Sequence, residues 1–296
     1  MTIRIGINPI AWTNDDLPEL GDATPLDTCL AEGKQAGYDG FELGRKFPRD
    51  AKALKPILER HGLALVGGWY SLRLLERDAD AEIAALQAHL QLLKALDCSV
   101  FIVAEVSRCI HGDRTIALSR RPRLGDREWE GFGKRMTAVG DYIQGQGMSL
   151  AYHHHMGTVV ETEAETDRLM ASTGPAVGLL LDTGHMTFAG GDPLAVARRH
   201  GPRIQHVHCK DIRPQVLAQA RAKDWSFLDA VVQGVFTVPG DGCVDYPAVL
   251  GEVKRQGYRG EWLVVEAEQD PAVANPLHYA TMGQRYLRKL AAELGF

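Results

Sequence analysis

Short apolar segments alternate with longer segments of helical periodicity along nearly the whole chain, and this alternation restricts the possible folds more than any other feature. The pattern is typical of βαβ units, in which helices connect the strands of a parallel sheet. Eight candidate strands can be assigned, at residues 3–7, 40–43, 64–67, 100–104, 149–152, 177–181, 204–208 and 262–266. Because eight such units close a (β/α)8 barrel, we predict an α/β fold of the TIM-barrel type.

No linker rich in Gly, Ser or Pro divides the chain, so the predicted barrel is a single domain of residues 1–296. Residues 81–96 carry Leu and Ile at spacings of three and four, which predicts one of the outer helices. Two junctions, after Gln35 and Gln256, share a Gly-Tyr-x-Gly pattern between a predicted helix and a predicted strand. An open, doubly wound sheet is the alternative to the barrel.

Composition and charge narrow the range of partners. A net charge of -5 provides no basic surface for a phosphate backbone, so we expect a small-molecule partner rather than nucleic acid. Neither a long apolar run nor a signal-like start is present, which leads us to expect a cytoplasmic protein without membrane contact. Five cysteines without a C-x-x-C pair fit reduced thiols. A homo-oligomer is compatible with the sequence.

Two long segments interrupt the alternation. Residues 107–127, which are rich in arginine, follow the fourth predicted strand, and residues 211–242 follow the seventh. Barrel enzymes carry their active-site loops at these positions. For the arginine-rich segment, a solvated surface or an oligomer contact is an equal alternative.

Acidic, imidazole and lysine side chains lie at the ends of five of the predicted strands. In chain order they are Glu42; His153, His154 and His155; Asp182 and His185; His206, His208 and Lys210; and Glu266 and Glu268. The carboxyl ends of barrel strands meet at one mouth, so these side chains should converge. Alternation along a strand places residues two apart on the same face.

Imidazole and carboxylate donors without thiolates suit Mn²⁺, Co²⁺, Zn²⁺ or Fe²⁺ in a catalytic site. Buried charge at so many strand ends would be costly without a partner, and a metal ion is such a partner. We expect Asp182, His208 and Glu266 as ligands, together with a residue of the fifth strand. A single histidine is more often a core or surface residue than a ligand, and no role is assigned to His61, His111, His200 and His278.

Other site chemistries lack their sequence patterns. The chain has no G-x-S-x-G elbow, no P-loop and no dinucleotide fingerprint. A Schiff-base lysine at Lys210 is possible, but the neighbouring imidazoles and carboxylates favour a metal enzyme. The cluster at residues 14–16 is most simply a turn, although it follows the first strand and therefore overlies the mouth.

Five segments carry a resemblance to a known family, at residues 8–21, 41–48, 152–158, 181–185 and 206–211. They resemble the motifs of the xylose-isomerase-like barrel enzymes and, within them, of the inosose dehydratases of myo-inositol catabolism. The stretch WTNDDLPELG is highly specific, whereas DTGH and HVHCKD are shared across the superfamily. The resemblance extends over nearly the whole chain.

The resemblance implies removal of water from 2-keto-myo-inositol (scyllo-inosose) to give a trihydroxycyclohexane-1,2-dione. It also implies Mn²⁺ or Co²⁺ and reduced glutathione, and the donor set leaves Zn²⁺ possible. Asp182, His208 and Glu266 match the superfamily's metal ligands. His153 stands where the family carries a glutamate, so the fourth ligand is expected to be His153 or Glu161.

Roles for the other polar residues follow from a dehydration that begins with loss of a proton beside the ketone. The base is expected to be His155 or Glu42, and Lys210 or His185 is expected to stabilise or protonate oxygen. The expected substrate-binding residues are Trp12, Asn14, Trp69 and His206. The alternatives are a ketose epimerase or isomerase of the same superfamily and a non-catalytic polyol-binding protein. A barrel endonuclease is less favoured because the chain is acidic.

Overall fold

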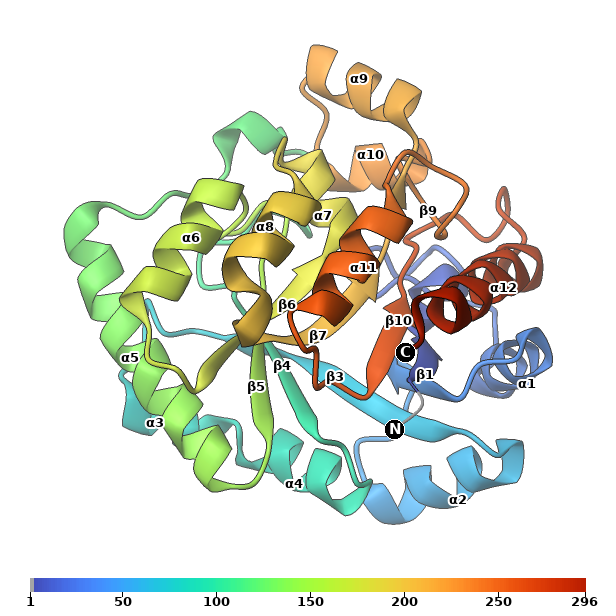
Figure 1. Ribbon diagram of the computed structural model, residues 1–296, viewed down its shortest axis with the longest axis horizontal. Coiled ribbons are helices and arrows are strands. Elements are labelled where there is room, and N and C mark those ends of the chain that lie inside the picture. The colour runs from blue at the N-terminus through green and yellow to red at the C-terminus, as the bar shows by residue number, and fades with distance from the viewer. Residues whose placement is uncertain (1–2) are drawn as a thin grey trace.

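Eight parallel strands form a closed barrel in the computed structural model, which describes residues 3–296 (Figure 1). In barrel order they are β1 (Arg4–Ile7), β10 (Trp262–Val265), β7 (Ile204–Cys209), β6 (Val177–Asp182), β5 (Ser149–His153), β4 (Val100–Glu105), β3 (Ala64–Leu72) and β2 (Gly40–Leu43). The first strand pairs with both β2 and β10, which closes the sheet. The predicted barrel is therefore confirmed, and the open sheet was the wrong alternative.

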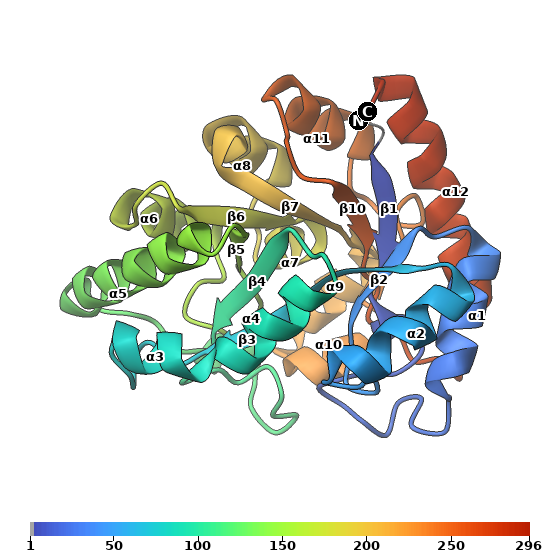
Figure 2. The ribbon, with the colours of Figure 1, turned by 90° about the horizontal axis from the view of Figure 1, so that it is seen from below.

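Helices surround the strands, as Figure 2 shows. The outer helices are α1 (Leu26–Ala36), α2 (Ala51–His61), α3 (Ala79–Ala85), α4 (Gln87–Ala95), α5 (Asp126–Gly145), α6 (Glu163–Ser172), α8 (Pro193–His200), α11 (Tyr246–Arg255) and α12 (Pro276–Leu294). The chain also forms a short helix, α7 (Thr183–Phe188), and three 3-10 turns, η1 (Pro9–Ala11), η2 (Leu118–Arg120) and η3 (Gly201–Arg203). Within residues 3–296, no helix has the length and apolar character that a membrane span needs.

The single helix predicted over residues 81–96 is wrong, because the chain forms two helices there. The break lies at Leu86, whose φ of -77° and ψ of -6° interrupt the helical path. The two parts then pack on different neighbours, α3 against α5 and α4 against β3. Leu86 is fully buried, so apolar burial is kept across the bend.

Layers of inward-facing side chains fill the barrel and decide where the polar residues lie. Two apolar clusters occupy the interior, one with Val66, Trp262 and Val264 and one with Val100, Ile102, Ala151 and Leu180. Inward positions recur every second residue along a strand. The next inward residue after Ala151 is therefore His153, and the next after Leu180 is Asp182. Strands β5 and β6 thus change from apolar to polar at the mouth.

The segment predicted as a long loop after the seventh strand contains its own elements. They are β8 (Asp211–Ile212), α9 (Pro214–Ala222), α10 (Phe227–Val232) and β9 (Phe236–Thr237), with β8 and β9 paired antiparallel. Helices α9 and α10 lie together at one end of the molecule in Figure 1. Phe227 and Phe236 belong to a separate apolar cluster that includes Met156. This small unit packs on the barrel mouth.

The arginine-rich segment after β4 is attached to its neighbours by specific contacts. Arg121 is buried and pairs with Glu161 at 3.0 Å and with Glu165 at 2.8 Å. Arg114 pairs with Asp229 of α10 at 2.6 Å. These arginines therefore hold the segment against the loop before α6 and against α10.

Close packing of α5 on α6 depends on Gly133, and a pair of substitutions in one helix tests this. A Cβ atom at Gly133 would lie 2.4 Å from the Ser172 carbonyl oxygen, whereas a Cβ at Gly145 would meet nothing within 4 Å. We expect Gly133→Ala to lower the free energy of unfolding by roughly 1–3 kcal/mol because the backbones must separate. Gly145→Ala should cause no loss. Urea unfolding of both variants provides the comparison, and equal stabilities would contradict this packing.

Candidate metal and active site

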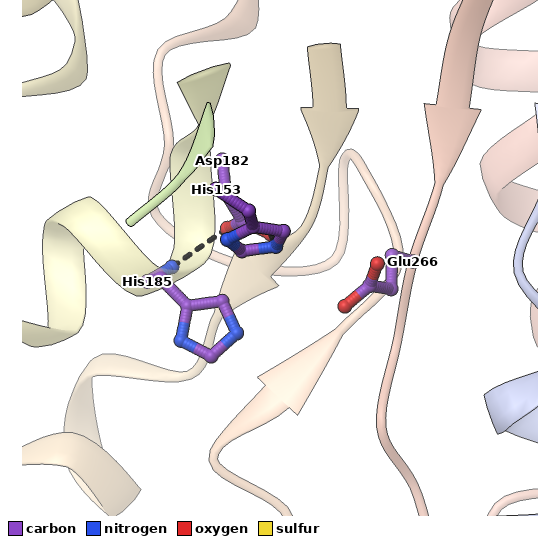
Figure 3. Close-up of side chains that lie close together, drawn as sticks. All are labelled: His153, Asp182, His185 and Glu266. Carbon is purple, nitrogen blue, oxygen red and sulfur yellow. Dashed lines mark hydrogen bonds and ion pairs between the residues drawn. The ribbon is translucent and has the colours of Figure 1, made fainter. Parts of the chain in front are cut away.

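Asp182 ends β6 and caps α7, and this double position fixes its carboxylate. Oδ1 accepts a hydrogen bond from the His185 backbone N–H at 2.7 Å, shown by the dashed line in Figure 3. Oδ2 is buried and has no hydrogen-bond partner. It lies 3.6 Å from His153 Nε2 and 3.6 Å from His208 Nδ1. Oδ1 therefore caps helix α7, and Oδ2 faces two imidazole rings.

Hydrogen bonds on the far side of each ring orient His153 and His208. His153 Nδ1 lies 2.7 Å from the His154 carbonyl oxygen, which makes Nδ1 the donor and leaves Nε2 unprotonated toward Asp182. His208 Nε2 lies 2.9 Å from Glu42 Oε1. Histidine ligands of metals in proteins are commonly held by such a carboxylate or carbonyl partner.

Glu266 directs one oxygen to His208 and the other to Lys210. Oε2 lies 2.6 Å from His208 Nδ1, although outside hydrogen-bond geometry, and Oε1 lies 2.6 Å from Lys210 Nζ. The fully buried Lys210 also contacts Glu268 Oε2 at 2.9 Å and His185 Nε2 at 2.9 Å. Burial by itself would lower the pKa of Lys210, but Glu266 and Glu268 raise it above its ordinary value. Lys210 is therefore a buried ammonium group that holds both carboxylates.

Glu42 bridges two histidines. Its Oε1 lies 2.9 Å from Nε2 of both His206 and His208, and its Oε2 accepts a hydrogen bond from Asn8 at 2.8 Å. Burial alone would raise the pKa of Glu42, but His208 and His206 lower it well below its usual range. Glu42 is thus an ionised carboxylate with partners on both oxygens.

This donor set fits a divalent cation. His153, Asp182, His185 and Glu266 each offer one ligand atom, all within 4.8 Å of one another, and Figure 3 shows Glu266 facing the other three. Burial would lower the pKa of His208, yet Glu266 and Glu42 raise it well above its ordinary value. The carboxylates therefore require positive charge at this point, and a buried anionic oxygen without a partner is costly. Nitrogen and oxygen donors of this kind suit Mn²⁺, Co²⁺ or Zn²⁺.

A cavity of about 350 Å³ opens beside this group of donors. Its lining consists of Asn8, Ile10, Asp15, Asp16, Glu42, Leu43, Arg49, Trp69, Ser71, Ile102, His111, His153, His155, His208, Glu266 and Glu268. Trp69 lies edge-on to His153 at 5.4 Å and to His155 at 5.5 Å between ring centroids. The Nδ1 of His155 is 2.8 Å from the Met156 carbonyl oxygen, so its Nε2 is unprotonated. Burial lowers the pKa of His155 well below its ordinary value.

Several predicted site residues lie outside the cavity lining. Lys210, His185 and His206 lie behind it. Lys210 contacts the lining residue Glu266, His206 contacts Glu42, and the His185 ring packs on the ring of His155 with centroids 3.9 Å apart. Trp12 is buried and donates its indole N–H to Glu32 at 2.6 Å. The indole N–H of Trp12 therefore has a partner outside the cavity.

Asn14, a predicted substrate-binding residue, is also absent from the cavity lining. Its Oδ1 accepts hydrogen bonds from the backbone N–H groups of Asp16 at 2.8 Å and Leu17 at 2.7 Å. Asn14 therefore forms the turn that its sequence context favoured.

The two candidates for the fourth ligand lie in different places. His153 belongs to the donor group around Asp182. Glu161 pairs with Arg121 at 3.0 Å and accepts a hydrogen bond from Gly157 N–H at 2.7 Å. In the part of the chain that the structure describes, Glu161 belongs to none of the clusters suited to a metal. Its partners offset its charge without a cation.

No role was predicted for several residues that line the cavity, among them Asn8, Asp16, Arg49 and His111. Asn8 and Asp16 follow β1, and His111 follows β4, so their positions after strands provided a signal. The approach of His111 to Asp16 left no signal in the sequence, because it brings together residues that are far apart in the chain.

Comparisons with known proteins agree with this architecture. Residues 30–290 match the family described as xylose isomerase-like TIM barrel. The chain is 54% identical to the rhizopine catabolism protein MocC of Rhizobium meliloti, over 100% of this chain and 91% of that protein. It is 43% identical to an inosose dehydratase of Geobacillus thermodenitrificans, over 97% of each. A sugar phosphate isomerase/epimerase structure from Parabacteroides distasonis, 15% identical, superposes with a TM-score of 0.70 over 99% of this chain and 96% of that one.

The unpartnered oxygen of Asp182 can be tested without loss of the helix cap. Asn caps helices as well as Asp does, so Asp182→Asn should keep α7 but remove the charge that attracts a cation. We expect metal content, measured by elemental analysis after reconstitution with Mn²⁺, to fall at least tenfold. Asp192→Asn changes an equivalent cap, at α8, and should leave metal content unchanged. Full metal content in Asp182→Asn would show that this oxygen is not a ligand.

Proposed function

The chain belongs to the xylose isomerase-like TIM barrel family, and from this premise we propose that it is a hydro-lyase of inositol catabolism. Its substrate in this proposal is scyllo-inosose, which loses water to give a trihydroxycyclohexane-1,2-dione. Full-length similarity to inosose dehydratases, at 43% and 42% identity, supports this choice. The observation that carries it is the cavity in which an unprotonated imidazole nitrogen lies beside a group of metal-type donors.

We assign the metal ligands as His153, Asp182, His208 and Glu266. His208 is preferred to His185 because the Nε2 of His185 contacts the Lys210 ammonium group, whereas the Nδ1 of His208 has no hydrogen-bond partner. A bound Mn²⁺ or Co²⁺ would supply Lewis acidity toward a ketone oxygen. Lys210 holds Glu266 in place through Oε1, and Glu42 orients His208.

His155 is assigned as the base that takes the proton beside the ketone. Its Nδ1 donates to the Met156 carbonyl group, so the free electron pair is on Nε2, and the side chain lines the cavity. Glu42 suits this role less well because both of its oxygens already have partners. General bases of this kind contribute roughly 10²–10⁴ in rate.

The cavity is of a size that suits a small cyclic polyol. Its volume of about 350 Å³ lies at the lower end of the range for small-molecule sites. Trp69 provides an apolar wall, and Asn8, Ser71 and Asp16 provide hydrogen-bonding groups along other parts of the lining. This mixture of one aromatic ring and a few fixed polar groups is typical of sites for uncharged sugars and related ketones.

A second candidate is a reaction of rhizopine catabolism. The higher identity to MocC, at 54%, favours it over a generic sugar epimerase. The two candidates differ in substrate and share the same cavity and donor group. A ketose epimerase or isomerase remains the third, because enolisation beside a metal is its first step as well.

Mass spectrometry distinguishes these candidates. Protein reconstituted with Mn²⁺ or Co²⁺ is incubated with scyllo-inosose, with and without reduced glutathione, and separately with rhizopine. Loss of water from scyllo-inosose supports the proposal, and an isomer of unchanged mass supports an epimerase. Conversion of rhizopine alone supports the second candidate, and an absence of all conversion would contradict an enzymatic role at this site.

The assignment of His155 predicts a specific loss of turnover. In His155→Gln, kcat for inosose dehydration should fall by roughly 10²–10⁴ because Gln cannot accept the proton. Metal content should be retained, since His155 is not among the assigned ligands. His278→Gln alters an exposed histidine on α12 and should leave kcat unchanged. A kcat within threefold of the unsubstituted protein in His155→Gln would exclude this base.

A further inference from the structure

We infer that His111 and Asp16 together bind one hydroxyl group of the substrate, at the end of the cavity away from the metal ligands, and so determine specificity. This inference rests on the proposed function, because it concerns the same cavity. His111 belongs to the segment between β4 and α5, and Asp16 to the segment between β1 and α1. Both residues line the cavity.

The two side chains are close enough for one ligand oxygen, placed beside them, to contact both. His111 Nε2 lies 3.6 Å from Asp16 Oδ1, which is longer than a good hydrogen bond. One hydroxyl group placed against both atoms can donate to the carboxylate and accept from the imidazole N–H. His111 Nδ1 is buried without a partner, and Nε2 is the ring nitrogen that faces Asp16.

Two other His–Asp pairs show what a closed pair looks like in this protein. His61 lies 2.9 Å from Asp27, and His200 lies 2.6 Å from Asp167. None of these four residues lines the cavity. Their atoms meet directly, whereas the pair in the cavity is open, as expected where a ligand group completes the contact.

A row of aromatic contacts places the pair relative to the metal ligands. Ring centroids of His153 and His155 are 5.3 Å apart, and those of His155 and His111 are 4.9 Å apart. Trp69 lies edge-on to all three imidazoles, at 5.4, 5.5 and 6.4 Å. A cyclic polyol beside Trp69, with its ketone at the His153 end, therefore presents its far hydroxyl groups to His111 and Asp16.

The backbone segments that carry both side chains are held in position before any ligand binds. The turn that carries Asp16 is fixed by Asn14, whose Oδ1 accepts the Asp16 N–H. Ile110, next to His111, donates its N–H to the Gly157 carbonyl at 2.9 Å. Gly157 has a φ of +75°, and a Cβ there would lie 2.9 Å from the His111 backbone nitrogen. Preorganised polar groups of this kind discriminate strongly against ligands that lack their partner group.

Binding calorimetry tests the inference independently of turnover. The metal-reconstituted protein is titrated with scyllo-inosose and with deoxy analogues that each lack one hydroxyl group. We expect His111→Gln and Asp16→Asn each to weaken inosose binding roughly 10- to 100-fold, as for loss of one hydrogen bond to the ligand. One of the deoxy analogues lacks the hydroxyl group that contacts His111 and Asp16. For this analogue, the variants and the unsubstituted protein should have the same affinity.

His61→Gln and Asp27→Asn make the same changes in a pair outside the cavity and should leave every affinity unchanged. Equal inosose affinities in His111→Gln and the unsubstituted protein would overturn the inference. So would a loss of affinity that is the same for every deoxy analogue, because it would indicate a general structural defect. Inosose binding without water loss would refute the proposed function. The ratio of the variants' affinities to that of the unsubstituted protein would still decide the role of His111 and Asp16. An absence of inosose binding to the unsubstituted protein would refute both.

Discussion

The surplus of carboxylate charge at the barrel mouth is the constraint on which the rest of the site depends. Four carboxylates are buried there: Asp182, Glu266, Glu268 and Glu42. Among the residues that the structure describes, the Lys210 ammonium group and the His208 imidazole contact these carboxylates. One oxygen of Asp182 still lacks a partner. Buried anions are stable only when paired, so the fold leaves a defined place for added positive charge.

Secondary structure fixes the direction of these groups. Asp182 is both the last residue of β6 and the cap of α7, so its carboxylate cannot rotate without loss of the helix start. His153 and His208 are each locked through the nitrogen that faces away from the donor group. The site is therefore preorganised by backbone and neighbouring contacts, which lowers the cost of ordering it on binding.

Much of this arrangement could be predicted from the sequence, because strand ends converge in a barrel and alternate residues share a face. These two rules predict that Asp182, His208, Glu266 and His153 lie at the mouth. They could not separate cavity residues from those one layer behind, such as Lys210 and His206, because the depth of a side chain depends on its neighbours from other strands. The Leu86 bend and the pairing of His111 with Asp16 likewise arise from tertiary packing, which leaves no periodic signal.

The two segments at the mouth are attached to each other as well as to the barrel. Arg114 pairs with Asp229, Ser119 bonds to Asp224, and Leu118 donates its N–H to the Trp225 carbonyl. Residues 107–127 and the unit from β8 to β9 are therefore joined to each other by an ion pair and hydrogen bonds. Replacing either with the corresponding segment of another barrel enzyme would leave these contacts without partners, so a change of substrate by loop exchange requires both to be transferred together.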